Sequence, residues 1–306
     1  MSLFDYNSPL IHIKELKKPV SFQIGNEFKT IFKFNSKYYM AEDRCQHRGM
    51  KLCHSKTYDN NSMTCPYHGK SNSVKQELYV FGNYLWTTDP RNFFSEVPDH
   101  FIFSGSLDVL LDAPFHVVVD NFNEGSHTPY VHRFLGPESS DLSEVSFSWE
   151  RLEDFIHIKY KTNQKKNFIF YGFKKNRTID WVIDWKTYVK PMHMRYYSEW
   201  IDRKTQEKVI EKNMTFFFLT PVGQNKTRIH AFVYIQPMTW MKYFPYLVKK
   251  ASLFMTKNQI LEDQWFYPKI ADLPNSLDQL KLDQYDQPLT AIRERAEAFY
   301  SGFIAK

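Results

Sequence analysis

Two short groups of metal-ligating side chains lie near the start of the chain, with seventeen residues between them. The first group contains Cys45 and His47, and the second contains Cys65 and His68. Together they offer two thiolates and two imidazoles. Such a set can hold a two-iron, two-sulfur cluster, in which one iron takes the thiolates and the other takes the imidazoles. It can also hold a structural zinc ion, because zinc accepts mixed sulfur and nitrogen ligands.

The distribution of the ligands favours the cluster over zinc. Zinc sites usually pair Cys with Cys and His with His at close spacing, whereas each group here carries one of each. Two loops of this kind can each give one ligand to each iron, and the residues between them are enough for a hairpin that brings the loops together. The stretches CQHRGMKL and CPYHG resemble the Rieske domain of ring-hydroxylating oxygenases in residue type and spacing. The resemblance implies that Cys45, His47, Cys65 and His68 hold a 2Fe–2S cluster.

Two details depart from the pattern of that family. Lys70 follows CPYHG, where the family usually has an aromatic residue, and Cys53-His54 adds a third cysteine and a further histidine inside the hairpin. We expect Cys53 to be a small buried apolar residue; a stray metal ligand or an oxidisable thiol are the alternatives. All three cysteines lie between positions 45 and 65, so none remains for a disulfide framework, which indicates a reducing compartment.

A second pair of histidines, His127 and His132, lies in the stretch DNFNEGSHTPYVH at 120–132. Residues five apart do not share a face of a regular helix, where the contact spacing is three or four. Thr128 could cap a new helix that has Pro129 at its first position. His127 would then precede the helix and His132 would lie one turn inside it, so both imidazoles could converge on one ion.

A non-heme iron(II) that activates oxygen takes two histidines and one carboxylate on a single face and keeps open positions for oxygen and substrate. The expected third ligand is Asp263, in the sequence LEDQW on a predicted C-terminal helix. The neighbouring Glu262 is the alternative, because the sequence does not say which carboxylate points inward. A histidine pair alone is weak support for a metal site, but here it follows the Cys/His loops.

Nearly the whole chain resembles the oxygenase (alpha) component of a Rieske non-heme iron oxygenase. The resemblance assigns His127 and His132 as iron ligands and places Glu124 at a position where the family more often has Asp. It implies that Glu124 bridges His127 to His68 of a neighbouring subunit, and that Asn121 hydrogen-bonds close to the iron. The alternative for Glu124 is a carboxylate that stabilises a helix N-terminus.

The strand and helix pattern predicts an α+β fold in two domains, at 1–105 and 106–306, and the resemblance implies that these are a Rieske domain and a catalytic domain of helix-grip type. Hairpins are predicted around Asn35-Ser36 and Gly82-Asn83, and 103–111 is expected to be a connector. Alternation of apolar and polar residues predicts strands at 144–149, 155–161, 167–173, 182–189, 195–200, 214–219 and 228–234. Residues 121–135 suggest a broken helix, and the chain from Trp240 onward is expected to be mainly helical.

Composition limits the function further. The net charge of +6 on 306 residues is modest and the basic residues are scattered, so a basic stripe that binds nucleic acid is not expected. The basic residues are instead expected to form either a patch that docks an acidic electron donor or an ordinary solvated surface. No run of 18 apolar residues and no leader is present, which suggests a cytoplasmic protein. The aromatic and basic stretch at 240–255 is expected to be a helix on the body or at a subunit contact, with a membrane-surface helix as the alternative.

The resemblance implies an oxygenase that takes single electrons through the cluster and uses O2 at the iron to hydroxylate or demethylate an aromatic or alicyclic small molecule. No GxGxxG or other nucleotide motif is present, so a separate flavin and iron–sulfur reductase, or a ferredoxin, is expected to supply the electrons. The family's two metal sites are far apart within one subunit, which implies a head-to-tail homotrimer. Aromatic cis-dihydroxylation, a Rieske electron carrier without oxygenase activity and a zinc-stabilised binding module are the alternatives.

Overall fold

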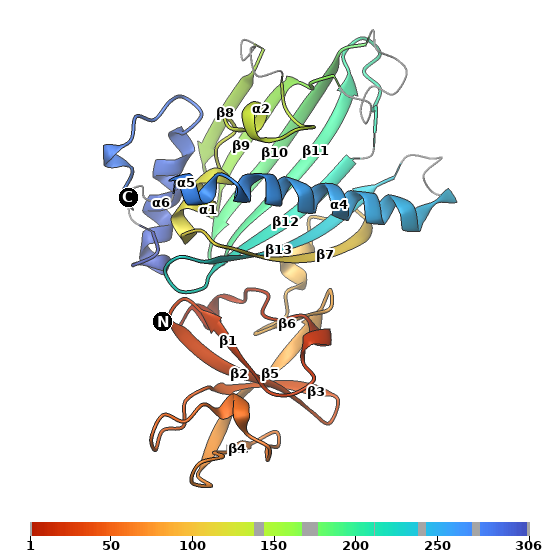
Figure 1. The fold of residues 1–306 in the computed structure, drawn as a ribbon. Helices are drawn as coiled ribbons and strands as arrows, with labels where there is room; N and C mark the ends of the chain where they lie inside the picture. The colour runs from red at the N-terminus through yellow and green to blue at the C-terminus, as the bar shows by residue number, and fades with distance from the viewer. Residues whose placement is uncertain are drawn as a thin grey trace. The chain divides into compact units, whose positions relative to one another are not determined.

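The computed structural model describes residues 2–137, 144–166, 177–210, 212–237, 243–270 and 276–304 (Figure 1). The chain divides into two compact units. The first consists of Met1–Glu96 and Thr220–Gln224, and the second of Val97–Leu219 and Asn225–Lys306. The boundary expected at 105 lies inside strand β7 (Ile102–Leu111), which belongs to the sheet of the second unit.

The first unit is built on a six-stranded antiparallel sheet in the order β1-β2-β3-β5-β4, with β6 paired to β5. Both predicted hairpins are confirmed: the turns at Asn35-Ser36 and Gly82-Asn83 have positive φ at all four residues, as their tight two-residue turns require. Short 3-10 helices lie at Leu3–Tyr6, Ile13–Glu15, Leu52–His54 and Arg91–Phe94. The strands are β1 Val20–Ile24, β2 Glu27–Phe34, β3 Lys37–Glu42, β4 Ser62–Thr64, β5 Ser71–Phe81 and β6 Tyr84–Trp86.

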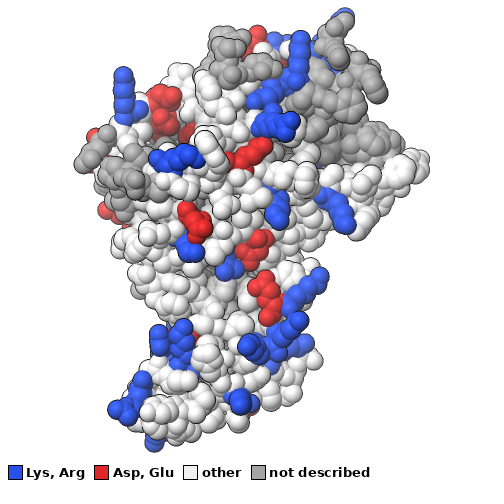
Figure 2. Space-filling view, viewed as in Figure 1, with Lys and Arg blue, Asp and Glu red and all other residues white. Residues whose placement is uncertain are grey.

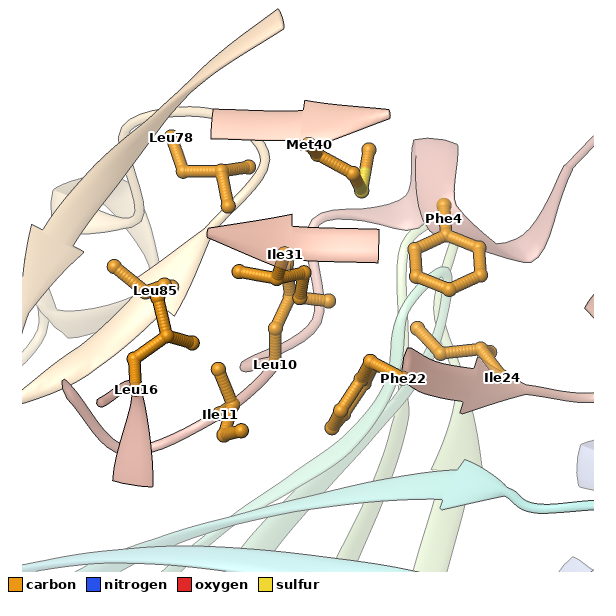
Figure 3. Close-up of a cluster of buried hydrophobic side chains, with 10 residues drawn as sticks. All are labelled: Phe4, Leu10, Ile11, Leu16, Phe22, Ile24, Ile31, Met40, Leu78 and Leu85. Atoms are coloured by element: carbon orange, nitrogen blue, oxygen red, sulfur yellow. The ribbon is translucent and has the colours of Figure 1, made fainter. Parts of the chain in front are cut away.

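Two groups of buried side chains hold this unit together. The larger one joins the N-terminal segment to the sheet (Figure 3), with Phe4 and Phe22 in edge-to-face contact and Leu10, Ile31 and Leu85 fully buried. The smaller one lies behind the ligand loops and includes both Cys45 and Cys65. The ligand loops therefore rest on a packed core.

The second unit contains a seven-stranded antiparallel sheet in the order β7-β13-β12-β11-β10-β9-β8. Six of the predicted strands match observed strands, and the one expected at 167–173 lies outside the described residues. The connector expected at 103–111 is wrong, because this segment is β7 and pairs along its length with β13. The remaining strands are β8 Ser146–Arg151, β9 Ile156–Asn163, β10 Ile179–Val189, β11 Met192–Asp202, β12 Lys212–Pro221 and β13 Thr227–Gln236.

Helix α4 (Pro245–Gln264) crosses one face of this sheet (Figure 1). Its buried residues recur every three or four positions, from Val248 through Ile260 to Asp263, so they form one helical face. Gly105 of β7 allows close packing, because a Cβ there would lie 2.8 Å from the Leu253 side chain. The other helices are α1 Phe115–Asn121, α2 Thr128–Val131, α5 Tyr267–Ile270, a 3-10 turn Leu277–Gln279 and α6 Gln287–Tyr300.

The aromatic and basic segment expected on the body of the protein packs only in part. One face of α4 is buried, but Tyr246, Leu247 and Phe254 on the other face are 64–70% exposed. Residues 240–242 of the segment lie outside the described residues. No helix in the described part of the chain is long and apolar enough to cross a membrane.

Candidate functional site

The two ligand loops of the first unit share one backbone pattern. The N–H of Gly49 donates to the carbonyl of Cys45 (2.8 Å), and the N–H of Gly69 donates to the carbonyl of Cys65 (3.0 Å). The amide of each cysteine in turn donates to the carbonyl of the residue after that glycine (2.9 and 2.8 Å). Both glycines have positive φ (+72° and +67°), a conformation that favours glycine. The glycine in each sequence motif therefore closes its loop.

These loops place sulfur inside and imidazole outside. Cys45 and Cys65 are 3% and 2% exposed, whereas His47 and His68 are exposed and their ring centroids lie 4.9 Å apart. A hydrogen bond from the backbone N–H of His47 lowers the pKa of the Cys45 thiol, which favours the thiolate that binds metal. The predicted ligands are thus brought together in an arrangement that suits a cluster with its histidine-bound iron at the surface.

A buried carboxylate that our sequence analysis missed supports the first loop. Asp43 is fully buried and accepts hydrogen bonds from the hydroxyls of Ser21 and Thr30 (2.6 Å each) and from the N–H of Cys53 (3.1 Å). Burial raises the pKa of Asp43, but the hydroxyl hydrogen bonds outweigh it and lower the pKa overall. Cys53 is half-buried, and burial together with Asp43 raises the pKa of its thiol. All three cysteines are free.

The second unit brings His127, His132 and Asp263 together. The two Nε2 atoms lie 3.3 Å apart, and Oδ1 of Asp263 lies 3.6 Å from one and 3.7 Å from the other. An ion bound at about 2.1 Å from imidazole nitrogen and carboxylate oxygen fits a triangle of this size. Oδ1 of Asp263 is buried and has no hydrogen-bond partner in the described part of the chain. Two imidazoles and one carboxylate on one side of an ion are typical of a non-heme iron(II) site.

The backbone around His127 and His132 differs from the prediction, although the two imidazole rings still face the same point. Helix α2 is a single turn in which His127 is the N-cap residue and His132 is the C-cap residue. Pro129 lies in the first turn, but the N-cap residue is His127 and not Thr128, which is instead the first residue of the helix. His132 therefore lies just beyond the helix rather than one turn inside it, and a one-turn helix with a histidine at each end lets both rings face one point.

Each histidine is held from behind by a different glutamate. Nδ1 of His127 hydrogen-bonds to Oε1 of Glu124, and Nδ1 of His132 lies 3.1 Å from Oε2 of Glu262. The other oxygen of Glu124 accepts hydrogen bonds from the N–H and hydroxyl of Ser126 (2.6 Å each). Carboxylates in this position fix the orientation and tautomer of metal-binding imidazoles. The two neighbouring carboxylates therefore have different positions: Asp263 completes the ligand triangle, and Glu262 lies behind His132 and orients its ring.

The charges at this site favour a cation. Burial lowers the pKa of His127, but Glu124 and Asp263 outweigh this effect and raise the pKa to about 9. Burial raises the pKa of Asp263, and His127 and His132 partly offset the rise. Asn121 hydrogen-bonds to Asp263 and accepts a hydrogen bond from the hydroxyl of Tyr267 (2.8 Å). Asn121 therefore lies beside the Asp263 carboxylate, and no sequence pattern indicated Tyr267.

Side chains from distant elements fix the segment that carries these ligands. Arg293 of α6 is 1% exposed and donates from Nε to Asp120 (2.9 Å), with a second hydrogen bond from its Nη2. The hydroxyl of Tyr196 donates to the carbonyl of Phe122. Asp120 and Phe122 lie four and two residues before Glu124, so the ligand segment is attached both to α6 and to the sheet.

We expect Arg293→Met to lower the free energy of unfolding by about 3–5 kcal/mol, because it leaves the largely buried Asp120 carboxylate without its partner. The matched control is Arg151→Met, which breaks an exposed pair with Glu294 (2.6 Å) and should cost about 1 kcal/mol or less. Urea unfolding followed by circular dichroism measures both. Equal losses for the two variants would show that the buried pair does not stabilise the ligand segment.

The ligand triangle opens onto a cavity of about 120 Å³ within the second unit. Alternate residues of β10, β11 and β12 form its wall, and one face of α4 lies opposite. Tyr130, Phe134 and Phe216 do not line the cavity, and Trp240 lies outside the described residues. The aromatic residues that do line it are Phe122, Tyr160, Trp181, Trp185, Tyr196, Trp200 and Phe217.

Comparison with known proteins places these observations in context. Residues 7–76 match the family described as "Rieske [2Fe-2S] domain". Dicamba monooxygenase bound to dicamba has a similar structure, with a TM-score of 0.73, 15% identity, and coverage of 96% of this chain and 95% of that chain. Pseudomonas putida CBB5 NdmA with caffeine is also similar, with a TM-score of 0.62, 17% identity, and coverage of 99% and 96%. No curated protein sequence matches the chain.

Proposed function

We propose that this chain, which carries a Rieske domain and has the overall fold of Rieske oxygenases, is the oxygenase component of a Rieske non-heme iron oxygenase. It would take electrons at Cys45, His47, Cys65 and His68 and activate O2 at an iron held by His127, His132 and Asp263. The observation that carries the proposal is the ligand triangle, which opens onto a cavity that is lined by aromatic residues. When bound, the cluster supplies single electrons, and the iron(II) supplies open positions for O2.

The basic surface around the cluster loops of the first unit is the proposed point of electron entry. Residues 44–75 contain six Lys and Arg and one acidic residue. Figure 2 shows lysine and arginine side chains on the visible face of this unit, with few acidic side chains between them. Among the basic side chains near the ligand loops, Arg48 and Lys70 are exposed. A positive surface attracts an acidic partner and accelerates its association, so the donor is proposed to be an acidic ferredoxin or an iron–sulfur and flavin reductase.

In the second unit the protein's own groups position the reaction. Glu124 and Glu262 hold the Nδ1 atoms of the two histidines, which leaves both Nε2 atoms facing the ion site. Asn121 holds the Asp263 carboxylate in the same way. The aromatic wall excludes water and orients a flat molecule beside the ligands. Electron passage from one subunit to the next is proposed to run from His68 of a neighbouring subunit through Glu124 to His127, in a homotrimer.

Monooxygenation is the proposed reaction class. It is supported by the similar fold of dicamba monooxygenase, a protein named for this type of reaction. For a methoxylated or N-methylated substrate, O2 with two electrons and two protons gives one oxygen atom to the methyl carbon and one to water. The hydroxylated methyl group then leaves as formaldehyde. Aromatic cis-dihydroxylation remains the second candidate, because the same ligand set supports both reactions. An electron carrier without oxygenase activity would not need the glutamates behind each iron-binding histidine.

The test is coupled oxygen uptake by protein reconstituted with iron and sulfide. It is supplied with NADH, a surrogate reductase, and methoxylated, N-methylated or unsubstituted aromatic compounds. We expect a substrate that stimulates uptake and yields formaldehyde in proportion to the oxygen consumed. A cis-diol product would instead identify a dioxygenase. Reduction and reoxidation of the cluster without aromatic-dependent oxygen use across the panel would identify an electron carrier.

A further inference from the structure

We infer that the substrate is an uncharged single-ring aromatic compound that carries an amide-like group, and that Gln259 and Asn213 bind this group. The inference rests on the proposed function, because it concerns the molecule oxidised at the same site. Both side chains line the cavity next to the ligand triangle, Gln259 from α4 and Asn213 from β12.

The shape of the cavity favours a flat molecule. Strand pairing places Trp181 of β10 opposite Trp200 of β11, and Trp185 opposite Tyr196. The ring planes are nearly parallel in both pairs, at 8°, with centroids 6.2 and 5.4 Å apart. Such a wall offers aromatic faces and edges for stacking. A cavity of about 150 Å³ accommodates benzene in another protein, so a cavity of about 120 Å³ suits one ring rather than several.

Two primary amides of this wall have no hydrogen-bond partner in the described part of the chain, and neither do two buried tryptophan indole N–H groups of the same wall. The amides are those of Asn213 and Gln259, which are half-buried. The nearby Thr256, by contrast, donates to the carbonyl of Ser252 (3.0 Å). Each free primary amide offers an acceptor oxygen and two donors. A ligand that presents a carbonyl beside an N–H matches both, and a partner of this kind offsets the cost of a half-buried unpaired amide.

Gln259 is also placed to orient the ring relative to the iron ligands. It precedes Asp263 by four residues on α4, so the two side chains lie on one helical face, about 6 Å apart along the helix axis. A ring held at Gln259 would therefore present its far edge near the ligand triangle. The same contact would bind the molecule and select the position that reacts.

The charges of the cavity argue against a carboxylate substrate. Apart from Glu124, His127, His132 and Asp263 of the metal site, the lining residues in the described part of the chain are uncharged. A carboxylate that leaves water for this wall would find no lysine or arginine to pair with, which is strongly unfavourable. A neutral amide keeps its hydrogen bonds without this cost.

The experiment measures binding without turnover. Anaerobic, metal-loaded protein is titrated with benzamide, benzoate and toluene, and binding is followed by quenching of tryptophan fluorescence and by calorimetry. We expect benzamide to bind at least about tenfold more tightly than benzoate or toluene. Gln259→Leu and Asn213→Leu should each weaken benzamide binding by about threefold to tenfold and leave toluene binding unchanged or tighter.

The matched control is Asn258→Leu, which removes an amide from the adjacent position of α4 that does not line the cavity; its affinities should equal those of the wild type. Benzoate that binds as tightly as benzamide would overturn the inference, and so would unchanged benzamide binding in both Leu variants. Absence of binding by all three compounds would overturn it as well. Benzamide binding in a protein that never consumes oxygen would contradict the proposed function while leaving this inference standing.

Discussion

Asp263→Ala is expected to empty the second metal site and to reduce product formation by more than about a hundredfold. Loss of a side chain that merely orients a metal ligand costs about 10–100-fold in metal affinity or activity, and loss of a direct ligand should cost more. The effect should be confined to the second unit, because the cluster ligands lie in loops of the first unit, whose strands form a separate sheet.

Metal analysis and cluster spectroscopy measure this outcome together. Iron should fall from about three to about two atoms per chain, while the visible absorption of the cluster stays at the wild-type level. Glu262→Ala is the matched control at the neighbouring position. Because Glu262 contacts Nδ1 of His132 and not the ion site, this variant should keep much of its iron. An Asp263→Ala protein that retains all its iron and activity would show that Asp263 is not a ligand.

Glu124→Gln is expected to slow electron transfer from the cluster to the second site by about 10–100-fold, with both metals retained. Glutamine has the size of glutamate but no charge, so it cannot stabilise positive charge on the His127 imidazole to which Glu124 hydrogen-bonds. If Glu124 also contacts His68 of a neighbouring subunit, the substitution disturbs both ends of the route. Stopped-flow absorbance measures the rate at which the pre-reduced cluster is oxidised by O2 in the presence of substrate.

The companion variant is Glu262→Gln, which makes the same chemical change behind the other histidine. Both variants should alter product formation, because both glutamates orient an iron-binding imidazole. Only Glu124→Gln should slow cluster oxidation disproportionately. Equal rates of cluster oxidation in the two variants would show that Glu124 only orients His127. An unchanged rate in Glu124→Gln would show that Glu124 is not an electron-transfer bridge.

The parts of the structure that follow local rules could be predicted from the sequence. Each cluster loop is closed by hydrogen bonds between residues four or five apart, and a glycine with positive φ completes it. The tight hairpin turns at Asn35-Ser36 and Gly82-Asn83 depend on the same backbone property. These features need only neighbouring residues, so residue type and spacing were sufficient.

Features that depend on packing could not be predicted. Neighbouring positions on a helix point about 100° apart, and only the packing of α4 against the sheet decides that Asp263 rather than Glu262 faces the ion site. In β12 a difference of one residue exchanges faces, so Phe217 lines the cavity while Phe216 packs into the core. The connector expected at 103–111 is instead strand β7, whose partner, β13, lies more than one hundred residues later in the sequence.

The hydrogen bonds that hold the metal-binding segments in place could not be predicted from sequence patterns either. The Arg293 contact with Asp120 joins residues 173 apart, and Tyr267 reaches Asn121 from 146 residues away. Asp43 lies close to the first ligand loop in sequence, but its burial depends on hydroxyls from two strands. Single arginines, tyrosines and aspartates carry no spacing pattern that distinguishes such roles from surface positions.

Mössbauer spectroscopy of fully loaded protein enriched in ⁵⁷Fe tests the central claim most directly. We predict two kinds of iron environment in the oxidised cluster, from sulfur-ligated and histidine-ligated iron, and a separate high-spin iron(II) signal of about half their combined intensity. The iron(II) signal should disappear in Asp263→Ala while the cluster signals remain. A loaded wild-type protein that shows the cluster signals alone would contradict a second iron site at His127, His132 and Asp263.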